Sequence, residues 1–413
     1  MRRFVAVLSV LTLAAVLAPA EEPSAAPAEA SIVAAVDLNG PAPSPYKCAW
    51  PTIGGVNALN VALPDANATY WVHNYYLEDG MKFVVRGVYP FARFASFTTY
   101  DNAGTPLPDQ GMLVDAQIEP EDGSKNPFAT VDASNKLSER RYRVVITPHA
   151  DASSDNVLSG LPDGLDSGWG AVIYRLYVPD DPGSLRGSVP LPAMAYFSGP
   201  GQRSTLPPCK RTAATAMSDA SAAPGPRAIG MCWMSFCLPS STAGEYPNPA
   251  NAYVHAEAVF SAGRVVVVTG KAPTFPDTRA GESPALAKEM RYWSICEDLG
   301  YPVLPVVACK LDSEVPLTSD RFYTIVVSAK KDRPSNATAA NGVAWLPWGD
   351  HSYPAAIVLR NMLSNDAFCC SILKAISLGQ PVDVVMGDYY PHAKYCTKAG
   401  FEADGADCVA QSP

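Results

Sequence analysis

Several chemical signatures are missing from this 413-residue chain, and each absence narrows its function. There is no Gly-x-Ser-x-Gly, the motif that exposes the serine nucleophile of many hydrolases. Neither Gly-x-x-x-x-Gly-Lys-Ser/Thr nor Gly-x-Gly-x-x-Gly is present to bind a nucleotide phosphate. There is no Cys-x-x-Cys and the five histidines are scattered, so zinc is the weaker interpretation of the cysteines. We therefore expect no metal and no cofactor.

Basic runs and long apolar segments are also scarce. The chain has 31 Lys and Arg against 40 Asp and Glu, a formal charge of −9, and no cluster of basic residues follows in the sequence, so we expect no nucleic-acid partner. After residue 20 no segment is apolar over the roughly 20 residues that a transmembrane helix needs. We expect no membrane span in the mature chain.

The N-terminus has the pattern of a secretory signal peptide. Arg2 and Arg3 precede an apolar run at residues 4–17, which ends in the small-residue site Ala-Pro-Ala. A membrane anchor is the alternative, but the run is too short to span a bilayer. We predict a signal peptide at 1–20, a disordered leader rich in Ala, Pro, Glu and Ser at 21–44, and a secreted or extracytoplasmic location.

Ten cysteines behind a signal peptide predict disulfide bonds. We expect bonds between near neighbours in sequence, which are Cys296 with Cys309, Cys396 with Cys408, and Cys232 with Cys237. The sequence does not determine how Cys48, Cys209, Cys369 and Cys370 pair.

Two long stretches contain the same short sequence motifs in the same order, which predicts two tandem copies of one fold. Residues 84–90 and 267–273 both read Val-Val-x-Gly-x-x-Pro, and further matches occur along 71–178 and 253–363. We expect each matched glycine to permit a turn conformation that a side chain would oppose. The residues expected to superimpose are Gly87 on Gly270, Arg93 on Arg291, Gly164 on Gly349, and Arg175 on Arg360.

The local pattern favours strands. Short β-branched runs such as RVVVVTG are bounded by Gly, Pro, Asp and Asn, while helical periodicity is confined to Pro284–Asp298 and Asp366–Leu378. A parallel α/β fold would need a helix after nearly every strand. We predict a mainly β chain of two tandem β-sandwich, jelly-roll-like domains with few short helices.

The predicted domain boundaries follow composition. The first sandwich covers 45–205, a connector rich in Ala, Ser, Pro and Gly covers 206–250, and the second sandwich covers 251–413. The second sandwich includes a disulfide-closed extension from residue 364, for which no counterpart is expected after the first.

The chain resembles bacterial secreted jelly-roll domains of unknown function, present here as two tandem copies. The resemblance depends on Arg-aromatic-x-Ser, an aspartate-bearing turn, and a strand in which Tyr or Leu precedes Arg. It covers about 71–179 and 253–363, and it implies a β-sandwich and an exported protein, without an agreed activity.

One aromatic segment, residues 345–353 (WLPWGDHSY), is the candidate ligand site. Two tryptophans beside an Asp-His pair could stack on a sugar ring or another flat ligand. The alternative is a loop whose tryptophans cap the core. The predicted ligand contacts are Trp345, Trp348, Asp350 and His351, walled by Tyr389, Tyr390 and His392 from the extension.

Other polar residues receive structural interpretations. Arg93, Arg175, Arg291 and Arg360 recur in apolar runs, and we expect each to tie two strands together inside its own domain. His73 and His255, just ahead of the first strand of each copy, are expected to pack. The pairs Glu297 with Asp298 and Asp350 with Asp388 are nominal candidates for glycoside hydrolysis, although solvated turn residues are the simpler reading.

Three functions remain open at this stage. The first is a secreted non-catalytic protein that binds a small molecule or glycan, such as a saccharide or envelope component. The second is a secreted hydrolase or lyase that acts between the domains. The third is a structural or protein-interaction role at the cell surface.

Overall fold

The computed structural model describes residues 47–108, 110–151, 153–199, 202–209, 232–240, 246–300 and 303–412. The predicted signal peptide, the predicted leader and much of the predicted connector lie outside these residues. Within them no helix is long and apolar enough to cross a membrane.

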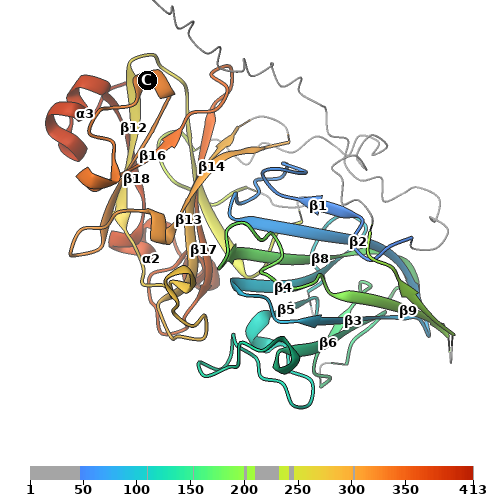
Figure 1. Ribbon diagram of the computed structural model, residues 1–413. Coiled ribbons are helices and arrows are strands. Elements are labelled where there is room, and N and C mark those ends of the chain that lie inside the picture. The colour runs from blue at the N-terminus through green and yellow to red at the C-terminus, as the bar shows by residue number, and fades with distance from the viewer. Residues whose placement is uncertain are drawn as a thin grey trace, which may run out of the picture.

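The chain is mainly β, as predicted, and forms four sheets in two sandwiches (Figure 1). Each sandwich encloses its own core of buried aliphatic and aromatic side chains. Successive side chains of a strand point to opposite faces, so each sheet directs one face toward that core.

Ten strands build the first sandwich. One sheet has the order β1 (Thr52–Gly54), β2 (Ala68–Glu78), β8 (Ser167–Pro179), β4 (Ala92–Tyr100) and β5 (Met112–Val114). The other has the order β10 (Gln202–Leu206), β9 (Ala193–Gly199), β3 (Lys82–Val88), β6 (Arg141–Thr147) and β7 (Val157–Ser159).

Eight strands build the second sandwich. One sheet has the order β11 (Asn251–Ala258), β17 (Ala355–Ser364), β13 (Met290–Leu299) and β14 (Val306–Leu311). The other has the order β16 (Val343–Pro347), β15 (Phe322–Ser328), β12 (Arg264–Lys271) and β18 (His392–Thr397).

The strand registers support the predicted duplication. Gly87 of β3 lies opposite Tyr142, and Gly270 of β12 lies opposite Tyr323. The only parallel pairs among the described strands, β6 with β7 and β15 with β16, also occupy matching positions. In the other sheets, Ser96 lies opposite Arg175 and Ser294 opposite Arg360.

The expected role of the glycines needs correction. Gly87 and Gly270 lie within strands, where an added Cβ would come within 2.3 and 2.6 Å of the hydroxyls of Tyr142 and Tyr323. Each glycine therefore leaves room for the ring of the tyrosine that faces it on the neighbouring strand. Gly164 does have a positive φ of 82°, but a Cβ on Gly349 would instead meet the side chains of Leu299 and Val307.

Two further expectations were wrong. Most of Pro284–Asp298, expected as a helix, belongs to strand β13, which is buried on both faces because one faces the core and the other faces the first sandwich. The expectation that the C-terminal extension has no counterpart is wrong for its strand β18, which pairs with β12 as β9 pairs with β3.

The second predicted helix is shorter than expected. Helix α1 (Ile372–Leu378) begins after Ser371, whose side chain accepts a hydrogen bond from Lys374 N–H, and ends at Gly379 with φ 61°. Two more short helices, α2 (Val382–Met386) and α3 (Lys398–Asp404), complete the extension.

Five disulfides are present among the described residues. They include the three pairs named from the sequence, Cys296–Cys309, Cys396–Cys408 and Cys232–Cys237. The remaining four cysteines form Cys48–Cys209 and the bond between neighbours Cys369–Cys370.

Candidate functional site

The two tryptophans of residues 345–353 do not form one platform. Trp348 is buried in the core of the second sandwich and 8% exposed, whereas Trp345 packs with the cluster on the opposite face of the same sheet. Trp345 Nε1–H donates to Ser328 Oγ at 3.0 Å, and Arg333 lies over its ring. Trp348 therefore caps the core, which was the alternative interpretation of this loop.

The other predicted ligand residues are also dispersed. Asp350 and His351 are exposed, and the His351 ring stacks on Phe260 with centroids 3.8 Å apart. Tyr390 is buried and donates to the Phe236 carbonyl, while His392 is exposed at the start of β18.

Tyr389 lines a small cavity with Lys271 and Trp293. The cavity holds only about 10 Å³, which is at the lower limit of what one water molecule needs. It is too small for a sugar.

The two histidines do not occupy equivalent positions. Both lie inside strands, β2 and β11, rather than ahead of them. His73 belongs to the core side and its pKa falls to about 4 because burial disfavours the charged ring. The matched residues of β2 and β11 are Tyr70 and Tyr253, which lie opposite Arg175 and Arg360. His73 is the third residue after Tyr70 and His255 the second after Tyr253, so the two side chains point to opposite faces of their sheets. His255 lies beside Cys237.

Arg93 and Arg291 bridge the two sandwiches, which corrects the expectation that each would act inside its own domain. Arg93 pairs with Asp312 of the second sandwich and, at 3.2 Å, with Asp277. Arg291 pairs at 3.2 Å with Asp115 of the first. The duplicated residues thus exchange partners across the interface.

The two aspartates are held alike. Asp115 Oδ2 accepts from the Ala95 N–H at 2.7 Å, and Asp312 Oδ2 accepts from the Trp293 N–H at 3.2 Å. Burial raises the pKa of Asp312 to about 6 and raises that of Asp115, while the facing arginines act in the opposite direction. Because the sandwiches meet on β4 and β13, the partners of these arginines come from the other copy (Figure 1).

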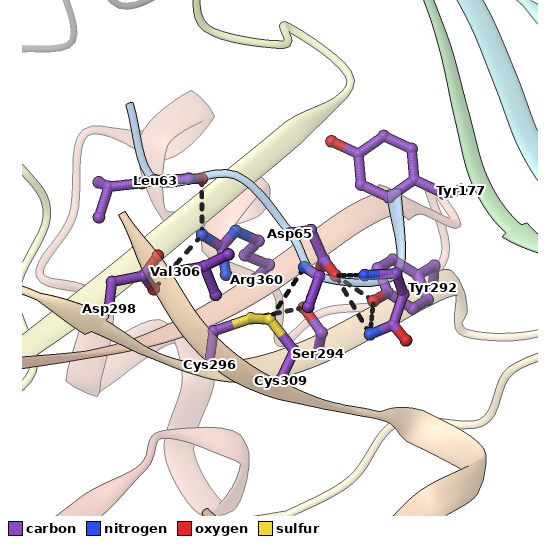
Figure 2. The surroundings of a disulfide bond; sticks show 12 residues. Leu63, Asp65, Tyr177, Tyr292, Ser294, Cys296, Asp298, Val306, Cys309 and Arg360 are labelled. Atoms are coloured by element: carbon purple, nitrogen blue, oxygen red, sulfur yellow. Dashed lines mark hydrogen bonds and ion pairs between the residues drawn. A yellow bond between two sulfur atoms is a disulfide. The ribbon is translucent and has the colours of Figure 1, made fainter. Parts of the chain in front are cut away.

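Arg360 and the Cys296–Cys309 disulfide lie in the same interface (Figure 2). Arg360 lies 3.7 Å from Asp298 and donates to the Leu63 carbonyl of the first sandwich at 2.8 Å. Asp65, in the same segment as Leu63, accepts from Tyr292 and Ser294 at 2.9 and 2.7 Å. Hydrogen bonds from Arg360, Tyr292 and Ser294 thus join the second sandwich to the Leu63–Asp65 segment of the first.

Arg175 has a different partner again. It donates to the Tyr246 carbonyl at 2.6 Å, and the rings of Tyr70 and Tyr100 lie beside its guanidinium. Tyr246 belongs to the predicted connector, so this arginine joins the first sandwich to the segment that leads to the second.

Two arginines that the sequence reasoning missed do act inside one domain. Arg140 donates to the carbonyls of Tyr89 and Pro90 at 3.1 and 2.9 Å. Arg321 donates to those of Ala272 and Pro273 at 2.9 and 2.6 Å. Both arginines stand in an Arg-x-Tyr motif at the start of a strand, β6 or β15, and this repeated motif could have identified them from the sequence.

The candidate carboxylate pairs do not form a reaction site. Glu297 and Asp298 have no exposed surface. Burial raises their pKa values to about 8 and 7. Raised pKa values suit general acids, but a catalytic group must touch substrate. Asp350 and Asp388 are exposed on separate loops, and backbone and side-chain contacts from Ser352 lower the pKa of Asp350.

A different surface combines charge with a hollow. The outer face of the β10-β9-β3-β6-β7 sheet carries a hollow of about 220 Å³ whose lining includes Arg86, Arg143 and Arg203. All three arginines are exposed. Its floor is apolar, with Val84 and Ala195 among the lining residues. We call this surface the basic face.

The same face of the second sandwich is closed by the chain itself. Val267, the counterpart of Val84, clusters with Phe401 of α3 and with the Cys396–Cys408 disulfide, and is 1% exposed. The basic positions are also lost, since Arg86 corresponds to Thr269 and Arg143 to Thr324 by register. Aligning the two Val-Val-x-Gly-x-x-Pro segments could have revealed this difference from sequence.

Comparison with known proteins identifies the fold alone. No protein-family model matches the chain, and no curated protein matches it. An uncharacterized protein from Burkholderia cenocepacia is similar in structure, with a TM-score of 0.50 and 14% identity over 85% of this chain and 82% of the other. A protein from Vibrio parahaemolyticus aligns with a TM-score of 0.40 and 11% identity, over 80% of this chain and 89% of the other.

Proposed function

We propose that this chain is a secreted, non-catalytic ligand-binding protein that recognises an anionic component of the cell envelope, such as an acidic saccharide, through the basic face. The observation that carries the proposal is the contrast between the two copies. One copy covers its outer sheet face with its own helix, and the other has a hollow on that face that is lined with arginines.

Charge supports an anionic ligand. The whole chain has a formal charge of −9, so a face with three exposed arginines stands against the general trend of the surface. Glu121 lies 3.5 Å from Arg86, and both side chains are partly exposed. An exposed ion pair contributes about 0.2–1 kcal/mol, so this contact leaves Arg86 available to a ligand.

Binding is favoured over catalysis because the region between the sandwiches is filled. Asp115, Asp298 and Asp312 there are at most 1% exposed, and their neighbours are arginines and a cluster that includes Phe94, Tyr177 and Tyr292. Export is supported by the sequence at residues 1–20 and by the five disulfides.

The test is binding of the mature protein to immobilised polygalacturonate, with neutral dextran as the uncharged comparison. We expect binding to polygalacturonate that weakens as salt rises, because exposed charges are screened. The triple variant Arg86→Ser, Arg143→Ser, Arg203→Ser should lose about tenfold in affinity, given about 0.2–1 kcal/mol per exposed contact.

Lys331→Ser is the control, since Lys331 is an exposed cation of the second sandwich. It should bind as the wild type does. Equal binding by the triple variant and the wild type would exclude the basic face as the site. Retention on dextran as strong as on polygalacturonate would exclude charge as the basis of recognition.

A further inference from the structure

The floor of the basic face is an apolar strip across three strands, which Thr205 borders on a fourth. Val84 of β3 lies opposite Ala195 of β9 on one side and Val145 of β6 on the other, and Ala195 lies opposite Thr205 of β10. Side chains at such positions share one face of the sheet. The hollow of about 220 Å³ lies over this strip and is lined also by Phe197.

Cationic side chains flank the strip along both edges. Lys82 and Arg203 lie in one row with Phe197, and the Lys82 ammonium is 5.4 Å from the centre of that ring. Arg86 and Arg143 lie opposite each other in the other row. Lys82 and Arg86 are four residues apart on one strand, so the two rows are about 13 Å apart, at about 3.3 Å per residue.

The second sandwich shows what this strip accepts. There the counterpart strip is covered by an apolar side chain, Phe401, which is fully buried. Its flanking positions lack the cations, since Val265 stands for Lys82 and Thr269 for Arg86. The one cation among the described residues of that strip, Lys394 opposite Val267, donates to the Cys408 carbonyl at 2.8 Å. In the second sandwich an apolar side chain of the same protein thus covers the strip. In the first sandwich the strip has no such cover among the described residues, and cations flank it.

We infer that the ligand of the basic face is an anionic amphiphile, with a single alkyl or acyl chain on the apolar strip and a phosphate or carboxylate head between the flanking cations. This inference rests on the proposed function and narrows it. Neither a purely polar anion nor a neutral hydrocarbon would match both the strip and the cations. Guanidinium groups bind both phosphate and carboxylate in bidentate geometry, so the head is defined by its charge.

The experiment is calorimetric titration of the mature protein with inorganic phosphate and with hexyl, octyl and decyl phosphate, each below its micelle concentration. Affinity should rise about twofold to fourfold with each added methylene until the strip is filled, because a fully buried methylene contributes about 0.8 kcal/mol. Inorganic phosphate should bind more weakly than every alkyl phosphate.

Two matched variants separate the strip from general surface effects. Phe197→Ser should reduce the dependence on chain length. Phe322→Ser should not, although Phe322 is likewise a partly exposed phenylalanine with a lysine, Lys271, 5.7 Å from its ring centre. Circular dichroism should show both variants folded.

The outcomes distinguish this inference from the proposed function. Equal affinities along the alkyl series, with polygalacturonate still bound through the arginines, would overturn the amphiphile and leave the anionic-ligand proposal standing. Failure of both the alkyl phosphates and polygalacturonate to bind would overturn both. A rising series that Phe197→Ser leaves unchanged would also overturn the inference, because the chain would then lie elsewhere.

Discussion

Glu297 provides the sharpest test of the packing within the second sandwich. Its side chain has no exposed surface, and burial raises its pKa from 4.5 to about 8, with the negative charge of Asp298 acting in the same direction and the Gly349 N–H opposing them. The folded protein therefore favours the neutral carboxyl. The stability that this group contributes is fully present below about pH 4.5 and is lost as pH rises through about 8.

The substitution Glu297→Gln keeps the shape and removes the ionisation. A pKa of about 8 in place of 4.5 corresponds to about 5 kcal/mol as an upper limit, at about 1.4 kcal/mol per pH unit. Relaxation around the charged group reduces this, so we expect about 2–3 kcal/mol. At about 2–4 °C per kcal/mol for a domain of this size, the variant should melt about 5–10 °C above the wild type at pH 9.

The assay is thermal unfolding of wild type and variant from pH 4.5 to pH 9, followed by calorimetry. The difference between them should be near zero at pH 4.5, should grow up to about pH 8 and should level off above it. Asp350→Asn is the control, because that carboxylate is exposed, and it should bring no gain at pH 9. A Glu297→Gln effect of the same size at every pH would refute the reasoning, because ionisation would then not be its cause.

Three further predictions concern the fold. Asp312→Asn should destabilise the protein by about 3–5 kcal/mol in urea unfolding, because it leaves the fully buried Arg93 without that partner. The double variant Arg93→Met with Asp312→Leu should recover much of this loss. Additive effects in the double variant would contradict the pairing. Gly270→Ala should lower the free energy of unfolding by about 1–3 kcal/mol, because its Cβ would lie 2.6 Å from the Tyr323 hydroxyl. Gly199→Ala is the control and should not destabilise the protein, because there is open space around Gly199. Equal losses of stability in the two variants would argue against this contact. Peptide mapping without reductant should recover Cys48 linked to Cys209 and Cys369 linked to Cys370, and free thiols at these positions would show the assignment to be wrong.

The repeat made much of the fold predictable from sequence. Val-Val-x-Gly-x-x-Pro marks β3 and β12, and the arginines 175 and 360 lie at matching registers of β8 and β17. Strand propensity and turn residues act locally, so a single sequence carries them. The helix expected before Asp298 failed because a strand buried on both faces has no clear alternation of apolar and polar residues.

The partners of buried polar residues could not be predicted in the same way. Arg93 and Arg291 recur at equivalent sites, and recurrence suggested a role inside each domain, but two copies that pack against each other can exchange such contacts. Trp348 shows that residues close in sequence need not share a site, since Asp350 and His351 are exposed while the ring of Trp348 lies in the core. Which side of a sheet a side chain occupies depends on register.

The basic face was visible in the sequence only through a comparison of the two copies. The two cations of 82–88, Lys82 and Arg86, are separated by three apolar residues, so the sequence shows no basic run there. Strand alternation gathers Lys82, Val84 and Arg86 on one face of β3, and β6 and β10 add Arg143 and Arg203.

The central claim is that ligands bind on the basic face and not at residues 345–353. Hydrogen–deuterium exchange of the mature protein, with and without decyl phosphate or polygalacturonate, tests it directly. The account predicts slower exchange in β3, β6, β9 and β10 on ligand addition, and unchanged exchange at 345–353. Protection confined to 345–353 and the region around Tyr389 would contradict it.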